Sequence, residues 1–294
     1  MNLSTKQVAV SAYFFKKAID FFVFVQKSAT LYFKFLSSSL MQTLSSNMLK
    51  KERHAFIIRQ INLHNKVLSS DLSLQLQVSE DTVRRDLNEL AEAGKILKVH
   101  GGALSKSFHF PYEQKDIYAR DSKKEVARKA ISLISEGMVV LTGGGTTMLE
   151  MARLIPDDLE ATFFTISPLV ALELAERKSL TVILLGGQLS KNSQVNMGAK
   201  TVSDLSEIRV DLCFLGANGI DLKEGITDSD WEVVQVKKAM IRSSARSVIM
   251  CIGEKLNSVQ KMKICGLNAI DYLVTELKST DPKVYAYDGH TKVM

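Results

Sequence analysis

The sequence predicts an α/β protein with two domains, a small helical domain and a larger one built on a mainly parallel sheet. Closely spaced amphipathic segments fill residues 48–105, and apolar strand-like runs alternate with helical runs from residue 122 onward. The 294 residues, of which 46% are hydrophobic, are enough for about two buried cores. The expected order is an extension (1–47), a helical domain (48–105), a linker (106–121), an α/β domain (122–280) and a C-terminal tail (281–294).

Residues 1–47 are the most aromatic part of the chain, but lysines interrupt their apolar runs. No run approaches the ~20 apolar residues that a membrane-spanning helix needs, so no membrane partner is expected. An amphipathic surface helix, a signal peptide without a clear cleavage site, an additional helix and an untranslated segment all remain open.

Three helices are predicted within residues 48–105. Residues 53–61 have the 3.6-residue period of a supporting helix, and residues 70–76 form a second, shorter one. The third covers residues 79–90, and Ser79 caps its first turn. Its apolar face carries Val83, Leu87 and Leu90. Three helices with a tight turn before the third predict a helix-turn-helix.

The polar face of the third helix is suited to a DNA groove. It carries Arg84, Arg85 and Asn88. Arginine pairs well with guanine, and asparagine with adenine. Residues 95–104 then alternate apolar and polar side chains before paired glycines, which predicts a winged hairpin whose Lys98 and His100 meet phosphates. The alternative is an ordinary solvated helix face, where adjacent arginines are common.

This segment resembles the DNA-binding domain of the DeoR family of bacterial transcription regulators. The residues that carry the resemblance are Arg53, Ile57, Ile61, Ser79, Thr82, Val83, Arg84, Arg85, Asp86, Leu87 and residues 99–103. The candidate DNA-binding residues are therefore Ser79, Thr82, Arg84, Arg85, Asn88, Lys98 and His100. The resemblance also implies a start at Met48, so that residues 1–47 result from a misplaced start codon. Gln77 departs from the family, in which a small turn residue is common.

The net charge of +6 is unevenly distributed. Residues 1–47 carry +4 and residues 48–105 only +2, whereas the remaining acidic and basic residues cancel. Affinity for DNA phosphates grows with the number of contacts. Because this domain is only weakly basic, tight DNA binding needs more than one copy of it. A homodimer or homotetramer on double-stranded operator DNA is therefore expected.

Neither the cysteines nor the histidines have the spacing of a metal site. Cys213, Cys251 and Cys265 are far apart, and none of the five histidines stands at ligand spacing from them. No metal and no cofactor are therefore expected. Unpaired cysteines also suit a reducing cytoplasm better than a disulfide framework.

From residue 122 the chain alternates helices with short apolar strands. The first helix is predicted over residues 123–135. Strands are predicted over residues 139–141, 162–165, 182–185, 211–215, 248–251 and 272–275. Further helices are predicted over residues 147–154, 168–177, 199–205 and 231–243. Strands that are almost wholly apolar, in β-then-α order, predict a buried, mainly parallel, Rossmann-like sheet.

A glycine-rich turn follows the first of these strands. It consists of Gly143, Gly144, Gly145, Thr146 and Thr147. Open parallel sheets bind ligands beyond the carboxyl ends of their strands. Here the glycines let backbone N–H groups converge, and the start of the next helix favours an anion, so the turn suits a phosphate. The alternative is tight packing without a ligand.

Later strand ends extend the DeoR resemblance to residues 48 to about 280. They match the family's sugar-phosphate-sensing domain at Gly186, Gly187, residues 215–221, residues 225–228 and Lys237. That domain is similar in fold to ribose-5-phosphate isomerases and glucosamine-6-phosphate deaminases. The resemblance thus implies a Rossmann-like sensor domain with a phosphorylated sugar as its ligand.

The same resemblance implies a role for each matching residue. Gly145, Thr146 and Thr147 hold the phosphate, with Gly143 and Gly144 in the same turn. Gly186 and Gly187 let the ligand approach the backbone, Lys237 lies at the polar end of the site, and Lys255 is a weaker candidate. Without the resemblance, Lys237 is better explained as a solvated helix lysine.

Four positions depart from the family pattern. Gly143 and Gly144 replace an Asp-Ser pair, Ile166 replaces asparagine, and Asn218 replaces aspartate. Each change removes a charged or polar group that binds sugar hydroxyls, so the effector differs from that of better-known members. Fewer carboxylates also disfavour sugar-phosphate isomerisation, which needs a carboxylate base. Asp221, Asp228 and Asp230 remain nearby.

The expected function is that of a cytoplasmic transcription regulator, a repressor of carbohydrate genes, controlled by a phosphorylated sugar. The alternative is a sugar-phosphate isomerase or deaminase with an accessory DNA-binding module, which turnover of a sugar phosphate would reveal. A DNA-binding scaffold without a ligand is a further alternative.

Overall fold

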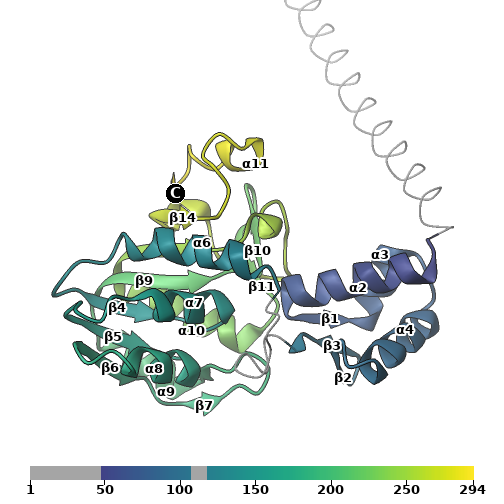
Figure 1. The fold of residues 1–294 in the computed structure, drawn as a ribbon, viewed down its shortest axis with the longest axis horizontal. Helices are drawn as coiled ribbons and strands as arrows, with labels where there is room; N and C mark the ends of the chain where they lie inside the picture. The colour runs from purple at the N-terminus through teal and green to yellow at the C-terminus, as the bar shows by residue number, and fades with distance from the viewer. Residues whose placement is uncertain (1–47, 107–117) are drawn as a thin grey trace, which may run out of the picture.

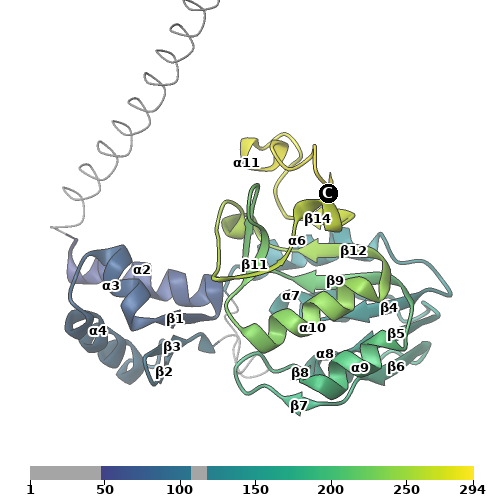
Figure 2. The same cartoon turned by 180° about the vertical axis from the view of Figure 1, so that it is seen from behind.

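The computed structural model describes residues 48–106 and 118–294, which form two domains (Figure 1). The smaller domain lies at one end of the larger one, and the C-terminal end of helix α2 points toward the larger domain (Figures 1 and 2). Residues 1–47 and most of the expected linker lie outside the described residues. The expectations for those segments therefore stay predictions.

The smaller domain is a winged helix-turn-helix. Its elements are α2 (Lys50–His64), β1 (Lys66–Leu68), α3 (Ser69–Leu76), α4 (Glu80–Glu92), β2 (Leu97–Val99) and β3 (Gly102–Leu104). The three predicted helices and the hairpin are confirmed. Strand β1 was not predicted, because so short a segment has no periodicity of its own; it forms by pairing with β3, with Val67 opposite Ala103.

The core of the winged-helix domain uses the apolar faces that the sequence pattern indicated. Ile57 and Ile61 of α2 pack with Val83 and Leu87 of α4, and all four side chains are fully buried. The turn between α3 and α4 passes through Gln77, whose φ of 52° lies in the left-handed region. Glycine adopts this conformation without strain, which explains why Gln77 is a less suitable turn residue.

The larger domain contains a seven-stranded sheet whose ladders are all parallel. Its strands are β4 (Val139–Thr142), β5 (Ala161–Thr165), β6 (Leu180–Leu184), β9 (Val210–Gly216), β12 (Ser244–Met250), β14 (Tyr272–Val274) and β15 (Lys292–Val293). Their spatial order is β15-β14-β12-β9-β4-β5-β6. The predicted parallel, Rossmann-like sheet is confirmed.

Helices cover both faces of this sheet. On one face lie α6 (Arg120–Ile131), α7 (Thr146–Leu154) and α8 (Pro168–Ala175), and on the other α9 (Ala199–Ser206) and α10 (Trp231–Arg242) (Figures 1 and 2). The five helices predicted for this domain are present. The first begins three residues before the predicted start and ends at Ile131, because turns follow in which the Ile134 amide donates to the Ile131 carbonyl (2.9 Å).

Several small elements were not predicted. They are a hairpin of β7 (Gln188–Leu189) and β8 (Asn196–Met197), a sheet of β10 (Gly219–Asp221), β11 (Gly225–Asp228) and β13 (Met262–Cys265), and two short 3-10 helices, η1 (Gly253–Lys255) and η2 (Leu267–Ala269). Each strand is too short to show periodicity, so pairing with its neighbours determines it.

The expectation of a C-terminal tail over residues 281–294 was wrong. This segment forms α11 (Pro282–Tyr285) and the edge strand β15. Tyr287 is fully buried, and its hydroxyl donates to the Asn257 side chain (2.9 Å). The segment is therefore part of the core. Across the two described ranges, no helix is long and apolar enough to cross a membrane.

Candidate functional site

Helix α4 is fixed on α2 by a buried ion pair. Arg53 donates from Nε and Nη2 to the two carboxylate oxygens of Asp86 (2.5 and 3.0 Å), and the ring of His54 lies 3.0 Å from the same carboxylate. Burial alone would raise the pKa of Asp86, but the hydrogen bonds from Arg53 and His54 hold it below its ordinary value. Asp86 therefore stays ionised and sets the orientation of α4.

The start of α4 is capped as predicted. The Ser79 hydroxyl accepts the Thr82 amide (3.2 Å) and lies 2.9 Å from the Thr82 hydroxyl. Glu80 and Asp81 occupy the positive end of the helix, and both bind Arg84 at 3.2 Å. These contacts lie on the solvent side, so the exposed Arg84 side chain is loosely held.

The solvent side of α4 and the wing form one polar surface. It consists of the exposed side chains Arg84, Arg85, Asn88, Lys98 and His100. Lys98 of β2 donates to the Asn88 side chain, which links the wing to the helix. The predicted DNA-contacting residues, apart from the capping pair Ser79 and Thr82, are thus all exposed, and one contact joins the helix to the wing.

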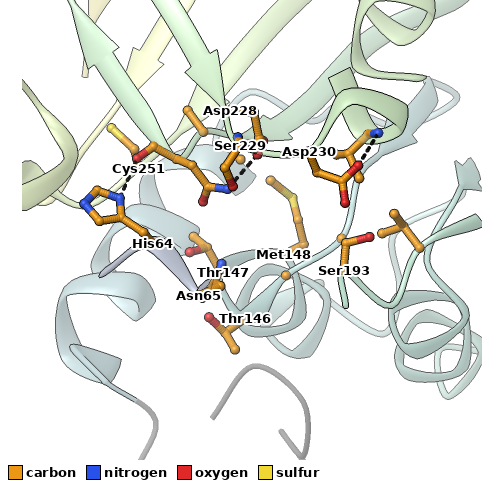
Figure 3. A pocket seen from close by; sticks show the side chains of 18 of the residues that line it. His64, Asn65, Thr146, Thr147, Met148, Ser193, Asp228, Ser229, Asp230 and Cys251 are labelled. Atoms are coloured by element: carbon orange, nitrogen blue, oxygen red, sulfur yellow. Dashed lines mark hydrogen bonds between the residues drawn. The ribbon is translucent and has the colours of Figure 1, made fainter. Parts of the chain in front are cut away.

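A second site lies at the carboxyl ends of β4 and β9. From β4 the chain moves outward to β5 and β6, and it then returns to the other side of β4 as β9, so the strand order reverses between β4 and β9. Ligands of open α/β sheets bind at such a reversal. A cavity is present there (Figure 3). The centres of water molecules can occupy about 130 Å³ of it. This is several times the volume a single water needs.

The glycine-threonine turn forms one wall of this cavity. Gly143, Gly144, Gly145, Thr146 and Thr147 all line it. Gly145 has a φ of 106°, which only glycine adopts readily, and it starts α7 without a side-chain cap. Within the described ranges, the first-turn amides of Thr146, Thr147 and Met148 have no protein acceptor. Three N–H donors therefore remain for a ligand.

Three lysines of the larger domain reach the cavity from different elements. Lys237 of α10 donates to Asp228 (2.6 Å) and to the Gly216 carbonyl (2.8 Å). Lys255 of η1 donates to the Ala217 carbonyl (2.8 Å), and Lys123 of α6 donates to the Tyr118 carbonyl (2.7 Å). Among the described residues, neither Lys123 nor Lys255 has a carboxylate within ion-pair distance.

Burial changes the acidity of these lysines. Burial, together with the charge of Lys237, lowers the pKa of Lys255 to about 8. Burial, together with the charge of Lys255, lowers the pKa of Lys123 to about 7. Asp228 stays ionised, because the charge and hydrogen bond of Lys237 outweigh the burial that would raise its pKa. The site favours an anion that compensates the lysine charges.

An unpartnered hydroxyl supports a polar ligand. Ser193 lines the cavity (Figure 3), and its buried Oγ has no hydrogen-bond partner within the described part of the chain. Buried polar atoms are normally satisfied. The Ser193 hydroxyl is therefore available to a ligand hydroxyl or phosphate oxygen.

Gly186 and Gly187 do not line this cavity, contrary to the expectation that they approach the ligand. A side chain at Gly187 would lie 2.1 Å from the Thr201 hydroxyl and 2.7 Å from the Met197 carbonyl. Gly187 therefore allows the segment before β7 to pack closely on β8 and α9. These glycines follow β6, an edge strand two places from β4 and three from β9.

Sequence reasoning missed several residues that line the cavity. They include Lys123, Ser193, and Asn62, His64, Asn65 and Lys66 of the winged-helix domain. Lys123 was recognised only as part of a helix, and the others lie far from the glycine-rich turn in sequence. Lys255, the weaker candidate, is a full member of the lining.

Both domains match families of known proteins. Residues 53–108 match the DeoR-like helix-turn-helix domain, and residues 119–277 match the DeoR C terminal sensor domain. The chain is 32% identical to the HTH-type transcriptional regulator GlpR of Haloferax volcanii, over 78% of this chain and 91% of that protein. It is 31% identical to the HTH-type transcriptional repressor GlcR of Bacillus subtilis, over 78% and 89%.

Two further similarities are recorded. The L-fucose operon activator of Escherichia coli is 30% identical over 78% of this chain and 96% of that protein. Among solved structures, ribose 5-phosphate isomerase A from Methanocaldococcus jannaschii is similar over 45% of this chain and 52% of that chain, with 19% identity and a TM-score of 0.32. The two domain matches and the relatives show the same family. The chain belongs to the DeoR family of helix-turn-helix transcriptional regulators.

Proposed function

We propose that this regulator is a cytoplasmic repressor of carbohydrate genes, and that a phosphorylated sugar bound in the cavity between β4 and β9 controls its affinity for operator DNA. One observation carries the proposal: the cavity lining combines four lysines and two aspartates with a helix start whose first three amides find no acceptor among the described residues. Buried cations without counter-charges are costly, and a phosphate relieves that cost.

The phosphate group is assigned to the start of α7. Gly143, Gly144 and Gly145 allow its close approach, and the amides and hydroxyls of Thr146 and Thr147 donate to its oxygens. Lys123 and Lys255 balance its charge. The Ser193 hydroxyl and the pair of Lys237 with Asp228 supply polar contacts for sugar hydroxyls.

The nearby carboxylates are already hydrogen-bonded to protein groups, which favours a site that binds a sugar phosphate over one that converts it. Asp228 binds Lys237 and accepts the Asn218 side-chain amide (2.8 Å), and Asp230 caps α10 by accepting the amides of Glu232 and Val233. Burial raises the pKa of the Cys251 thiol to about 12, so this thiol is not a nucleophile near neutral pH. We infer that the chain is not an enzyme. Release of an isomerised or deaminated product by the purified protein would contradict this.

In the winged-helix domain, Arg84, Arg85 and Asn88 are assigned to bases of the major groove, and Lys98 and His100 to phosphates. Ser79 and Thr82 are assigned to hold the start of α4 against the DNA backbone. A single copy offers few phosphate contacts, so two or four copies are expected on a symmetric operator. Sedimentation of the protein with and without operator DNA tests this expectation.

Thermal melting with matched ligands tests the proposed effector class. The panel contains D-glucose 6-phosphate, D-fructose 6-phosphate, D-ribose 5-phosphate and sn-glycerol 3-phosphate, each beside its unphosphorylated parent. A ligand that binds only the folded protein raises the melting temperature. We expect at least one phosphorylated member to do so while its parent does not. A flat response to the whole panel would contradict the proposed effector and favour a scaffold without a ligand.

A further inference from the structure

The cavity has walls from both domains. Most of its lining belongs to the sensor domain, but Asn62, His64, Asn65, Lys66 and Leu104 come from the winged-helix domain. Figure 3 shows His64 and Asn65 at the same cavity as Thr146, Thr147 and Ser193. A ligand there faces the DNA-binding module directly, without intervening elements.

Asn65 presents a free polar group to the cavity. It ends α2 in the left-handed conformation, with a φ of 63°, and its carbonyl accepts the Ser105 amide (2.9 Å). The backbone is thus fixed by the end of the wing. Within the described residues, the Asn65 carboxamide has no hydrogen-bond partner. A carboxamide held in this way offers both a donor and an acceptor to sugar hydroxyls.

His64 connects the end of α2 to the charged part of the cavity. Its Nδ1 lies 3.1 Å from the Asn218 carbonyl and 3.1 Å from the Gln260 side-chain nitrogen. The side chain of Asn218 in turn accepts from Lys255 (3.4 Å) and donates to Asp228 (2.8 Å), the partner of Lys237. Asn218 therefore links Lys255 and Asp228 to His64 at the end of α2.

A second contact between the domains begins at the residue next to Lys255. Glu254 of η1 accepts from Arg59 of α2 (2.8 Å) and from the Tyr118 hydroxyl (2.7 Å). The neighbouring residues Glu254 and Lys255 thus contact the winged helix and the cavity respectively. This ion pair therefore links η1, and with it Lys255, directly to α2.

We propose that the winged-helix domain completes the effector site. Asn65, the residue at which α2 ends, binds the sugar part of the effector, and the contact of α2 with η1 is needed for full effector affinity. This inference rests on the proposed function. It adds that the effector is recognised by both domains at once, so that ligand binding fixes the angle between the recognition helix and the sensor.

Two substitutions in the full chain test the inference, with the panel member that gives the largest melting shift as the probe. Asn65→Gly keeps the left-handed backbone and removes the carboxamide. We expect its dissociation constant to rise about fivefold, as for one lost hydrogen bond. Arg59→Gln lies outside the cavity and breaks the ion pair with Glu254. We expect a rise of about two- to fivefold, because that pair is partly exposed.

Each variant has a matched control. Gln77→Gly replaces a side chain by glycine at another left-handed position, with a φ of 52°, where the side chain is exposed and outside the cavity lining. Arg128→Gln breaks an ion pair with Glu125 inside α6. Both controls should bind the probe like the unmodified protein.

The outcomes separate this inference from the proposed function. Weaker probe binding by Asn65→Gly or by Arg59→Gln, with unchanged controls, supports the two-domain site. Unchanged binding by both variants overturns it, although the effector site itself stands. If no panel member shifts the unmodified protein, both the effector site and its two-domain form are overturned.

Discussion

Arg53 and Asp86 join the first and third helices of the winged-helix domain through a two-pronged ion pair, with N···O distances of 2.5 and 3.0 Å. The Asp86 side chain is only 2% exposed and that of Arg53 14%. Planar two-point contacts of this kind fix orientation as well as distance. The pair therefore holds the recognition helix at a defined angle to α2, which also carries the contacts to the sensor domain.

Replacement of Asp86 should destabilise the fold. Asp86→Ala leaves the Arg53 cation buried without a partner, and we expect the free energy of unfolding to fall by about 3–5 kcal/mol. Urea denaturation of the full protein measures this loss. Asp81→Ala, which removes an exposed partner of Arg84, should cost no more than about 1 kcal/mol. Equal losses in the two variants would show that the buried pair has no special role.

Removal of either exposed arginine of α4 should weaken DNA binding. Arg84→Ala and Arg85→Ala are each expected to cost about 1–3 kcal/mol of operator affinity, while the protein melts nearly unchanged, because both side chains are exposed. Fluorescence anisotropy at fixed salt measures the affinity. Arg128→Ala, on the sensor domain, is the control. Wild-type affinity in both α4 variants would remove this helix from the recognition role.

The two threonines of the turn should be needed for sensing but not for DNA binding. Thr146→Val with Thr147→Val keeps side-chain volume and removes both hydroxyl donors. We expect the phosphate-dependent melting shift to disappear while ligand-free operator binding persists. A full shift in the double variant would assign the anion to another part of the cavity.

Effector affinity should fall as pH rises. The pKa values of Lys255 and Lys123 lie at about 8 and about 7 in the ligand-free protein, and a bound anion favours their charged forms. Binding therefore takes up protons, and between about pH 7 and about pH 9 we expect at least a tenfold loss of affinity. The phosphate itself is dianionic throughout this range, since its second pKa is about 6.

Calorimetry in buffers of different ionisation enthalpy measures this proton uptake. Lys255→Met should bind more weakly at about pH 7 and lose less affinity with pH. A pH-independent affinity of the unmodified protein would contradict the role of the buried lysines.

Most of the fold follows from local sequence patterns. The repeat of Val83, Leu87 and Leu90 predicts α4, and the apolar runs around Phe163 and Phe214 predict buried strands. Strand β15 has no such signal, because Lys292 and Val293 become a strand only by pairing with β14. Short elements of this kind depend on tertiary contacts and are not encoded locally.

The candidate site likewise contains residues that the sequence reveals and residues that only the fold brings together. The turn of Gly143 to Thr147 is contiguous in sequence, so its chemistry is visible there. Lys123, His64 and Asn65 reach the cavity only through the packing of α6 and α2, and a lysine near a helix start looks like any solvated lysine. Gly187 was wrongly expected at the cavity, because the sequence does not show that β6, the strand before it, lies at the edge of the sheet.

The most direct test is the affinity of the effector for the protein with and without saturating operator DNA. Control of DNA binding by the ligand requires a coupling between the two sites, and that coupling is reciprocal. For a repressor that the ligand releases, we predict that the sugar phosphate binds more weakly in the presence of operator, by a factor of about 5 to 150, and that the ligand weakens operator binding by the same factor. Identical affinities in the two titrations would contradict the account, since the cavity then would not control DNA binding.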